Sequence, residues 1–220
     1  MLSLTEENYL KAIYHLSHDG TKGVSTSEIA EAMQTRAASV TDMIKKLSSK
    51  GLIEYEKYHG VAITRQGKTD ALNVIRKHRL WETFLVNKLG FAWGEVHEVA
   101  EQLEHIQSPL LIEKLEVFLG HPSYDPHGHP IPDKNGKVKE VKKQPLSNIE
   151  KGNQGKVCSV TDSSSSFLQY LDKVGIHIGS VLEVQEKEAF DGSLEVVVDG
   201  KRKTSLSKEA SENILIGVNN

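Results

Sequence analysis

Histidine and glutamate residues recur at helical spacing in the middle third of the 220-residue chain. Two segments carry them: the first holds His78 and Glu82, and the second holds His97, Glu101, Glu104 and His105. Side chains three or four positions apart lie on the same face of an α-helix. Two such faces can supply the mixed nitrogen and oxygen donors that bind a divalent transition metal. A solvated helix face, with these side chains paired to Lys and Arg, is the alternative explanation of the same spacing.

The donor set contains no thiolate. Cys158 is the single cysteine of the chain, which excludes a disulfide framework and a cysteine-rich zinc site. Oxygen-rich coordination favours Mn(II), or alternatively Fe(II), over zinc bound by sulfur. The sequence therefore predicts a site for one of these two ions.

The charge distribution agrees with a cation site. The net charge of −3 gives no indication of a nucleic-acid-binding protein from the chain as a whole. Residues 66–130, however, carry nine acidic and six basic residues, together with six of the ten histidines. A bound divalent cation would offset this local acidic surplus.

Catalytic motifs are not found in the sequence. The segment His97-Glu98-x-x-Glu101 lacks the second histidine of the zinc-protease motif. There is no glycine-rich phosphate loop and no nucleophile elbow. We therefore expect that the protein is not an enzyme. No run of 18 apolar residues is present, and the first residues lack the basic flank and apolar core of a secretory signal, so we expect a cytoplasmic protein.

The elements before the metal-ligand segments have the pattern of a winged helix-turn-helix. Two capping boxes, Ser3-x-x-Glu6 and Ser25-x-x-Glu28, predict the starts of a first and a second helix. A third helix is expected over about 36–50, followed by two strand-like runs at 52–55 and 61–64 that form a wing.

The third helix and the wing present small and basic side chains suited to DNA. Small residues let the backbone approach base edges, and lysines reach phosphates. The candidate DNA-binding residues are Arg36, Ala37, Ala38, Ser39, Thr41, Asp42, Lys45 and Lys46 in the helix, and Lys57 and Tyr58 in the wing. Because residues 34–59 hold only five basic and three acidic residues, we expect that useful binding requires two copies. A protein-interaction module is the alternative.

Three helices are expected to position the metal ligands. Their predicted ranges are 64–88, 93–106 and 109–120. Residues 121–136, with four of the six prolines, predict a stiff connection in which Asp125 and His127 point to the same side and can both reach a metal. Residues 137–145 are basic and polar, as in a linker. Strand-like runs follow at 156–160, 181–184 and 194–198, with a short helix at 167–171.

The sequence resembles the diphtheria-toxin-repressor and manganese-transport-regulator family of metal-dependent transcriptional repressors. The resemblance rests on Tyr9-Leu10-Lys11-Ala12-Ile13-Tyr14, Ser39-Val40-Thr41, Gly51-Leu52-Ile53, Arg76-Lys77-His78-Arg79-Leu80-Trp81-Glu82, the segment 96–105 and Asp125-Pro126-His127-Gly128-His129-Pro130-Ile131-Pro132. It implies a three-domain α+β protein: a winged helix-turn-helix domain (1–65), an all-α dimerisation and metal-binding domain (66–136), a linker (137–145) and a small SH3-like, FeoA-type β-barrel (146–220). The barrel would tune the metal-bound dimer or, alternatively, contact another protein.

The resemblance also implies the ligands. A principal site would use Asn8, Glu101, Glu104 and His105, an accessory site would use His78, Glu82 and His97, and Asp125, His127 and Asp162 would join them. Such a protein is a homodimer that binds double-stranded operator DNA when loaded with Mn(II), or alternatively Fe(II), and represses metal-uptake genes. A metal-independent winged-helix regulator remains the competing class.

Two positions depart from the manganese-type pattern. Position 101 is Glu, as in manganese-type members, but position 8 is Asn where those members usually have Asp. Lys11 replaces a carboxylate of the two-domain manganese regulators. Glu7 is an alternative donor, although helix geometry rotates it about 100° from position 8.

Overall fold

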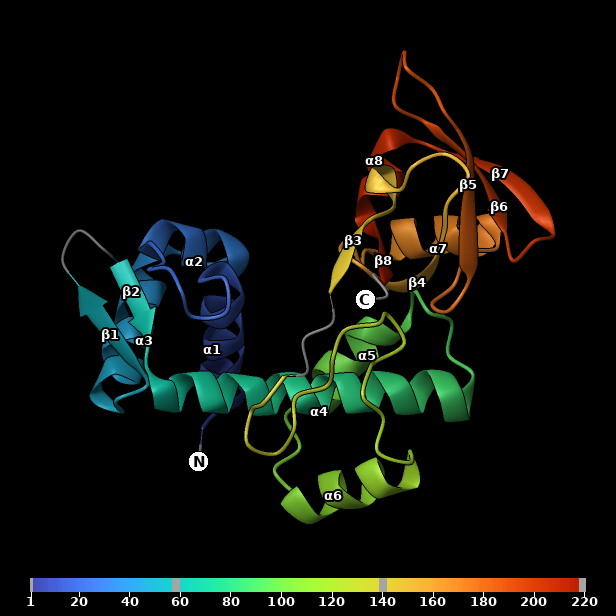
Figure 1. The fold of residues 1–220 in the computed structure, drawn as a ribbon. Coiled ribbons are helices and arrows are strands. Elements are labelled where there is room, and N and C mark those ends of the chain that lie inside the picture. Colours follow the sequence, from blue (N-terminus) through green and yellow to red (C-terminus); the bar gives the residue numbers. More distant parts are fainter. Residues whose placement is uncertain (1, 57–59, 139–141, 218–220) are drawn as a thin grey trace. The chain divides into compact units, whose positions relative to one another are not determined.

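The computed structural model describes residues 2–56, 60–138 and 142–217 (Figure 1). The chain divides into two compact units, each assembled from several segments. The first comprises Met1–His78, Glu101–Pro109 and Pro132–Val138, and the second comprises Arg79–Ala100, Leu110–Ile131 and Lys139–Asn220. The boundary between them falls within one long helix.

The expected winged helix-turn-helix is present at the start of the chain. Its elements are α1 (Leu4–Leu16), α2 (Thr26–Ala32), α3 (Ala37–Ser49), β1 (Ile53–Glu56) and β2 (Gly60–Ile63). Both predicted capping boxes form, with Ser3 and Ser25 as the N-cap residues. Strands β1 and β2 pair antiparallel to make the hairpin of the wing.

A single buried core holds these elements together. Leu10 and Ile13 of α1, Ile29 of α2 and Leu47 of α3 are fully buried in it. Val24 extends the hairpin by exchanging two backbone hydrogen bonds with Val61 of β2. The periodic apolar positions of three short helices are therefore satisfied by one another, as the spacing predicts.

The middle of the chain forms three helices: α4 (Arg65–Leu89), α5 (Val96–Leu103) and α6 (Pro109–Phe118). The prediction that the second of them extends to residue 106 is wrong, because α5 ends at Leu103 and a tight turn follows. The backbone N–H of Ile106 donates to the Leu103 oxygen, three residues back, which closes a tight turn instead of continuing the α-helical hydrogen bonding. His105 therefore does not continue the face of His97 and Glu101 as a third helical position.

The last part of the chain is a six-stranded antiparallel sheet with strand order β3-β8-β4-β5-β6-β7. The strands are β3 (Lys143–Pro145), β4 (Gln154–Val160), β5 (Val181–Lys187), β6 (Leu194–Val198), β7 (Arg202–Leu206) and β8 (Ile214–Gly217). The helical elements are η1 (Leu146–Asn148), α7 (Ser165–Val174) and α8 (Lys208–Asn213). Strand β3 lies inside the predicted linker, and β7, α8 and β8 were not predicted because their short segments lack a clear apolar alternation.

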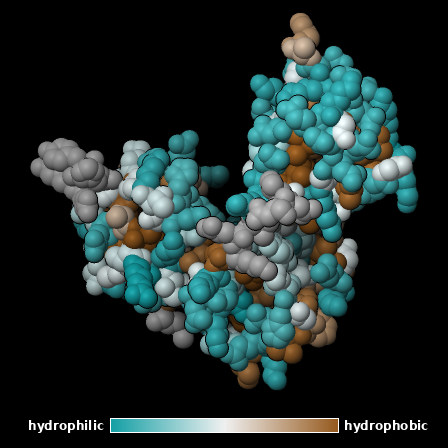
Figure 2. All heavy atoms as spheres, viewed as in Figure 1, coloured by the Kyte–Doolittle hydropathy of each residue, from teal (hydrophilic) through white to brown (hydrophobic). Residues whose placement is uncertain are grey.

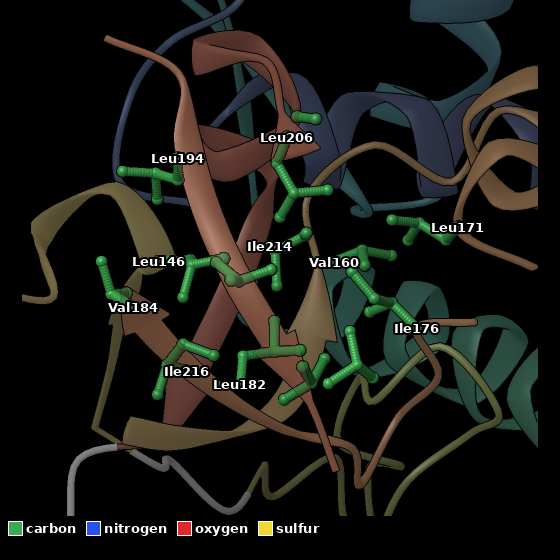
Figure 3. Packing of buried hydrophobic residues seen from close by; sticks show 14 of the residues in the cluster. Leu146, Val160, Leu171, Ile176, Leu182, Val184, Leu194, Leu206, Ile214 and Ile216 are labelled. Carbon is green, nitrogen blue, oxygen red and sulfur yellow. The ribbon is translucent and has the colours of Figure 1, made fainter. Parts of the chain in front are cut away.

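The interior of this β domain is aliphatic. Figure 3 shows Leu146, Val160, Leu182, Leu206 and Ile214 converging from η1 and from the four strands β4, β5, β7 and β8. Trp93, in the turn before α5, joins the same core. Within the second unit, the β domain is thus packed against the turn that precedes α5.

Among the described residues, no helix combines the length and apolar character that a membrane span requires. The face drawn in Figure 2 is mostly hydrophilic, but apolar atoms gather over α6 at the bottom of the view.

Candidate metal centre

Glu104 is the centre of the polar cluster in the first unit. Its side chain is completely buried, and both carboxylate oxygens accept hydrogen bonds from Lys11 Nζ, at 2.7 and 2.9 Å. Oε2 also lies 2.6 Å from Nδ1 of His78. Burial raises the pKa of the Glu104 carboxyl, but the His78 hydrogen bond and the Lys11 charge outweigh burial, and the pKa is below its usual value. Glu104 is therefore an anion whose negative charge is held in the interior.

Glu101 stands beside Glu104 at the end of α5. Its Oε1 is 3.4 Å from Lys11 Nζ, and its side chain is 51% exposed. Nε2 of His105 lies 3.7 Å from Oε1 of Glu104. Three of the four predicted principal ligands, Glu101, Glu104 and His105, thus surround one small region, which Lys11 also reaches from α1.

The fourth predicted ligand, Asn8, is half-buried, and within the described chain its side chain makes no hydrogen bond. The side chain from α1 that meets His105 is Glu7, whose Oε2 is 2.6 Å from His105 Nδ1. Gln107 Nε2 donates to the other oxygen of Glu7 at 2.8 Å, and Lys77 Nζ lies 3.5 Å from it. The rotation that separates Glu7 from Asn8 places Glu7 toward His105.

Glu82 is the centre of a second cluster, which lies in the second unit. Its side chain is buried on α4; Oε1 is 3.4 Å from His97 Nδ1, and Oε2 is 3.5 Å from His127 Nδ1. His78 precedes Glu82 by one turn of the same continuous helix. Glu82 and His97 were predicted as accessory ligands, and the fold adds His127 to them.

The imidazole of His127 has a defined orientation. Its Nε2 donates to the backbone oxygen of Trp93 at 3.1 Å, and its ring stacks on the Trp93 indole with centroids 5.7 Å apart. Burial lowers the pKa of His127, but the neighbouring Glu82 and Asp125 carboxylates raise it by more, so the net pKa is above its usual value. With Nε2 occupied as a donor, Nδ1 is the nitrogen that can bind a metal beside Glu82.

Donor atoms of Asp125, His127 and His129 also lie within 4.8 Å of one another. However, Oδ1 of Asp125 accepts the backbone N–H groups of His127 and His129, at 2.8 and 2.9 Å. Its Oδ2 is 3.1 Å from His129 Nδ1, and His129 Nε2 is 3.2 Å from the Val160 oxygen. Asp125 and His129 therefore shape the loop, which leaves His127 as its best-oriented candidate ligand.

Gly128 fixes the position of this loop against the β domain. Its φ is +79°, and a Cβ at this position would lie 1.7 Å from the Cys158 carbonyl oxygen. No other residue fits without moving the backbone. Asp162, another predicted ligand, accepts the backbone N–H of Ser164 at 2.8 Å in the bend before α7.

The predicted DNA-reading residues of α3 and its N-cap are all exposed; they are Arg36, Ala37, Ala38, Ser39, Thr41, Asp42, Lys45 and Lys46. Lys45 Nζ is 3.4 Å from Asp42, in an exposed pair. Lys46 and Lys50 instead bind the buried carboxylate of Glu6, at 3.3 and 2.6 Å. The predicted wing residues Lys57 and Tyr58 lie outside the described residues.

Comparison with known proteins agrees with this architecture. Residues 1–61 match the N-terminal DNA binding domain of iron dependent repressors, residues 64–133 match their metal binding and dimerisation domain, and residues 144–217 match the FeoA domain. A solved manganese-dependent transcriptional repressor in complex with manganese is 34% identical, with a TM-score of 0.83 over 96% of this chain and 99% of that chain. The chain belongs to the iron-dependent repressor family.

Other similar proteins are named IdeR. The iron-dependent repressor IdeR of Mycobacterium leprae is 34% identical over 128 residues, which are 58% of this chain and 55% of that protein. The chain thus matches only about half the length of that relative. The structure of T. acidophilum IdeR is 26% identical with a TM-score of 0.73, and the match covers both chains completely. Because the family is one of transcriptional repressors, the expectation that the chain is not an enzyme is confirmed.

The three-domain fold and the family resemblance are likewise confirmed, with the FeoA match in the predicted barrel region. The contacts that sequence reasoning missed are those of Glu7 and Lys11. These residues are four apart and lie on one face of α1, which is a signal visible in the sequence. Nothing in the sequence pairs that face with residues about 90 positions later.

Proposed function

We propose that the protein is a metal-activated transcriptional repressor that binds operator DNA as a homodimer, with Mn(II) as the activating ion and metal-uptake genes as its targets. The observation that carries this proposal is the convergence of Glu101, Glu104 and His105 near α1 of the DNA-binding domain. Two carboxylates and one imidazole, with no thiolate, suit a Mn(II) or Fe(II) ion.

The side chains of the principal site are suited to a cation. A cation, the Lys11 ammonium, already lies within 3.4 Å of both Glu101 and Glu104. The buried Glu104 carboxylate requires a positive partner, because an unpaired charge in the interior is strongly destabilising. Asn8, the remaining predicted ligand, would complete the principal site from α1.

The second cluster supports an accessory site. Glu82, His97 and His127 bring one carboxylate and two imidazoles together, and His78 lies one turn away on α4. The backbone oxygen of Trp93 holds the proton on Nε2 of His127 and directs Nδ1 toward Glu82. Asp125 and Asp162 remain proposed contributors, although both are engaged in local hydrogen bonds.

The exposed face of α3 supports the DNA-binding part of the proposal. Its first turn carries only small or polar side chains, and Lys45 follows on the exposed surface. Such a helix can enter a major groove, and its lysines can contact phosphates.

The apolar surface of α6 supports a second copy of the chain as partner. Leu110, Val117 and Phe118 are each more than 60% exposed, and Leu89 at the end of α4 is 58% exposed. Contiguous exposed apolar groups on a helix mark an interaction surface. A twofold dimer would present two α3 helices to two operator half-sites.

Metal and DNA would then be coupled by linkage. The principal site joins α1 of the DNA-binding domain to the turn after α5, so an ion that binds this arrangement more tightly shifts the population toward it. A coupling of about 1–3 kcal/mol is ordinary for such a switch.

The test uses DNA selected from a random-sequence pool by the full-length protein in Mn(II). Binding is then measured by fluorescence anisotropy with Mn(II), with Fe(II) under anaerobic conditions, and with a chelator. We expect tight binding only with metal, and binding lost in Glu101→Ala/His105→Ala but kept in Glu188→Ala/His177→Ala, a control that removes the same residue types from exposed positions. Equal affinity with and without chelator would favour the metal-independent regulator, and stronger activation by Fe(II) would reassign the ion.

A further inference from the structure

We propose that the Lys11 ammonium is a built-in competitor of the metal, which holds the principal site closed until an ion displaces it. This inference rests on the proposed function. Lys11 lies on α1 and Glu104 lies in the turn after α5, 93 positions later, yet Nζ is within 2.9 Å of both carboxylate oxygens.

The same ammonium reaches the second carboxylate of the site. Its Nζ lies 3.4 Å from Oε1 of Glu101, so it occupies the space between Glu101 and Glu104. The Lys11 side chain is only 17% exposed, and Glu104 is fully buried, so little water screens this pair. A divalent ion bound by both carboxylates would need the same space.

Competition between two cations for one pair of carboxylates has a definite consequence. The ammonium must leave Glu104 and be hydrated before an ion binds both glutamates. Its flexible four-carbon stem allows the head group to reach water without moving the helix. The free energy of that exchange is subtracted from the affinity of the site, which raises the metal concentration at which the protein responds.

The ammonium also has a role in the metal-free protein. Without it, the buried Glu104 carboxylate keeps His78 as a partner but loses the fixed positive charge that faces both of its oxygens. Lys11 therefore stabilises the metal-free fold and opposes loading, two effects of one contact.

The decisive variant is Lys11→Met, which keeps the length of the side chain and removes its charge. Mn(II) affinity is measured on the full-length protein by competition with a fluorescent metal indicator. We expect at least about tenfold tighter Mn(II) binding, which corresponds to ~1.4 kcal/mol. The melting temperature of the metal-free variant should fall, and the difference from the parent protein should shrink in saturating Mn(II).

Lys22→Met is the matched control. Lys22 forms an exposed ion pair with Glu28, so this substitution removes the same charge from another position of the first unit. Unchanged or weaker Mn(II) binding by folded Lys11→Met would overturn the inference. A failure of the proposed function would give a different result, because the parent protein itself would then bind no Mn(II) at this site.

A measurement on the unaltered protein covers the case in which the variant does not fold. An acylating reagent is added with and without Mn(II), and modification of each lysine is followed by mass spectrometry. We expect Lys11 to react faster in Mn(II), because displacement exposes its amine, while Lys22 reacts at the same rate. Equal or slower reaction of Lys11 in Mn(II) would contradict displacement.

Discussion

Oε2 of Glu7 lies 2.6 Å from Nδ1 of His105, a contact that joins α1 to the turn after α5 across 98 positions of sequence. An ionised carboxylate can only accept hydrogen bonds, so it places the imidazole proton on Nδ1. Nε2 is then the nitrogen that the proposed metal would use, and it is the one that faces Glu104, at 3.7 Å. Glu7 thus acts on the site through the tautomer and orientation of His105.

Replacing Glu7 should weaken the site without removing a ligand. We expect Glu7→Gln to lower Mn(II) affinity about 10–100-fold, the usual cost of losing a carboxylate that orients a ligating histidine. The indicator competition described for Lys11 measures this change. Histidine NMR spectra at neutral pH should also show His105 sampling both tautomers in the variant.

The companion variant Asn8→Asp distinguishes the role of Asn8 from that of its neighbour Glu7 on α1. If Asn8 is a ligand, an anionic oxygen at this position should tighten Mn(II) binding, because a carboxylate is a better donor than a neutral amide for a hard cation. Weaker binding by Asn8→Asp would argue against Asn8 as a ligand and leave Glu7 as the contribution of α1.

The two lysines of α3 should contribute unequally to DNA binding. Lys45→Ala should weaken binding to all sequences alike and reduce the salt dependence by about 0.9 in the slope of log K against log salt. Lys46→Ala should reduce it less, because the Lys46 ammonium lies 3.3 Å from Glu6. Salt titrations of the metal-loaded protein measure both slopes. An effect confined to one base position would contradict the phosphate assignment.

Trp93 should report ion binding at the second cluster, since its ring stacks on His127. In a Trp81→Phe background, which leaves Trp93 as the single tryptophan, we expect Mn(II) to quench the indole emission. His127→Ala should abolish the quenching, whereas His121→Ala, at an exposed histidine, should retain it. Quenching that persists without His127 would place the ion elsewhere.

Acid should destabilise the link between α1 and α3. Burial raises the pKa of Glu6, but hydrogen bonds from Lys50, Ser3 and Lys46 lower it from 4.5 to about 2. A lowered pKa stabilises the fold at pH values above 4.5, and this contribution is lost as the pH falls from 4.5 through about 2.

Glu6→Gln removes that pH dependence. Because both lysines are partly exposed to solvent, we expect a loss of only about 1–2 kcal/mol at pH 7. Urea unfolding from pH 7 to pH 3 compares the variant with the parent protein, and Glu31→Gln, at an exposed position of α2, is the control. A constant difference between Glu6→Gln and the parent across this range would refute the ion-pair explanation.

The dimer should depend on the apolar surface of α6. Phe118 is 61% exposed, and Phe118→Glu should convert the protein to a monomer, because an ionised group is costly to bury in an apolar interface. Analytical ultracentrifugation measures the oligomeric state. Phe190→Glu, at a fully exposed aromatic residue between β5 and β6, should remain dimeric. A dimeric Phe118→Glu would place the interface on another surface.

Local patterns in the sequence were sufficient for the helices of the first domain and for the candidate ligands on α4 and α5, whereas Asn8 and Asp162 follow only from the family resemblance. The capping boxes at Ser3 and Ser25 fix helix starts by hydrogen bonds within four residues, and the structure has both. The i, i+4 spacing of His78 and Glu82 reflects the helical repeat, and α4 contains both. The end of α5 was placed too late, because side-chain spacing does not show where backbone hydrogen bonding stops.

Side-chain types and short-range spacing therefore determined the family, the helix-turn-helix and the acidic, histidine-rich set of candidate ligands. Tertiary structure alone decided that Glu7 orients His105, that Lys11 occupies the position of a cation beside Glu104, and that His127 joins Glu82. The physical reason is the sequence separation over which each kind of interaction acts. Capping and helical periodicity act over three or four residues, whereas these contacts join positions 45 to 98 apart, which only the packing of separate elements brings together.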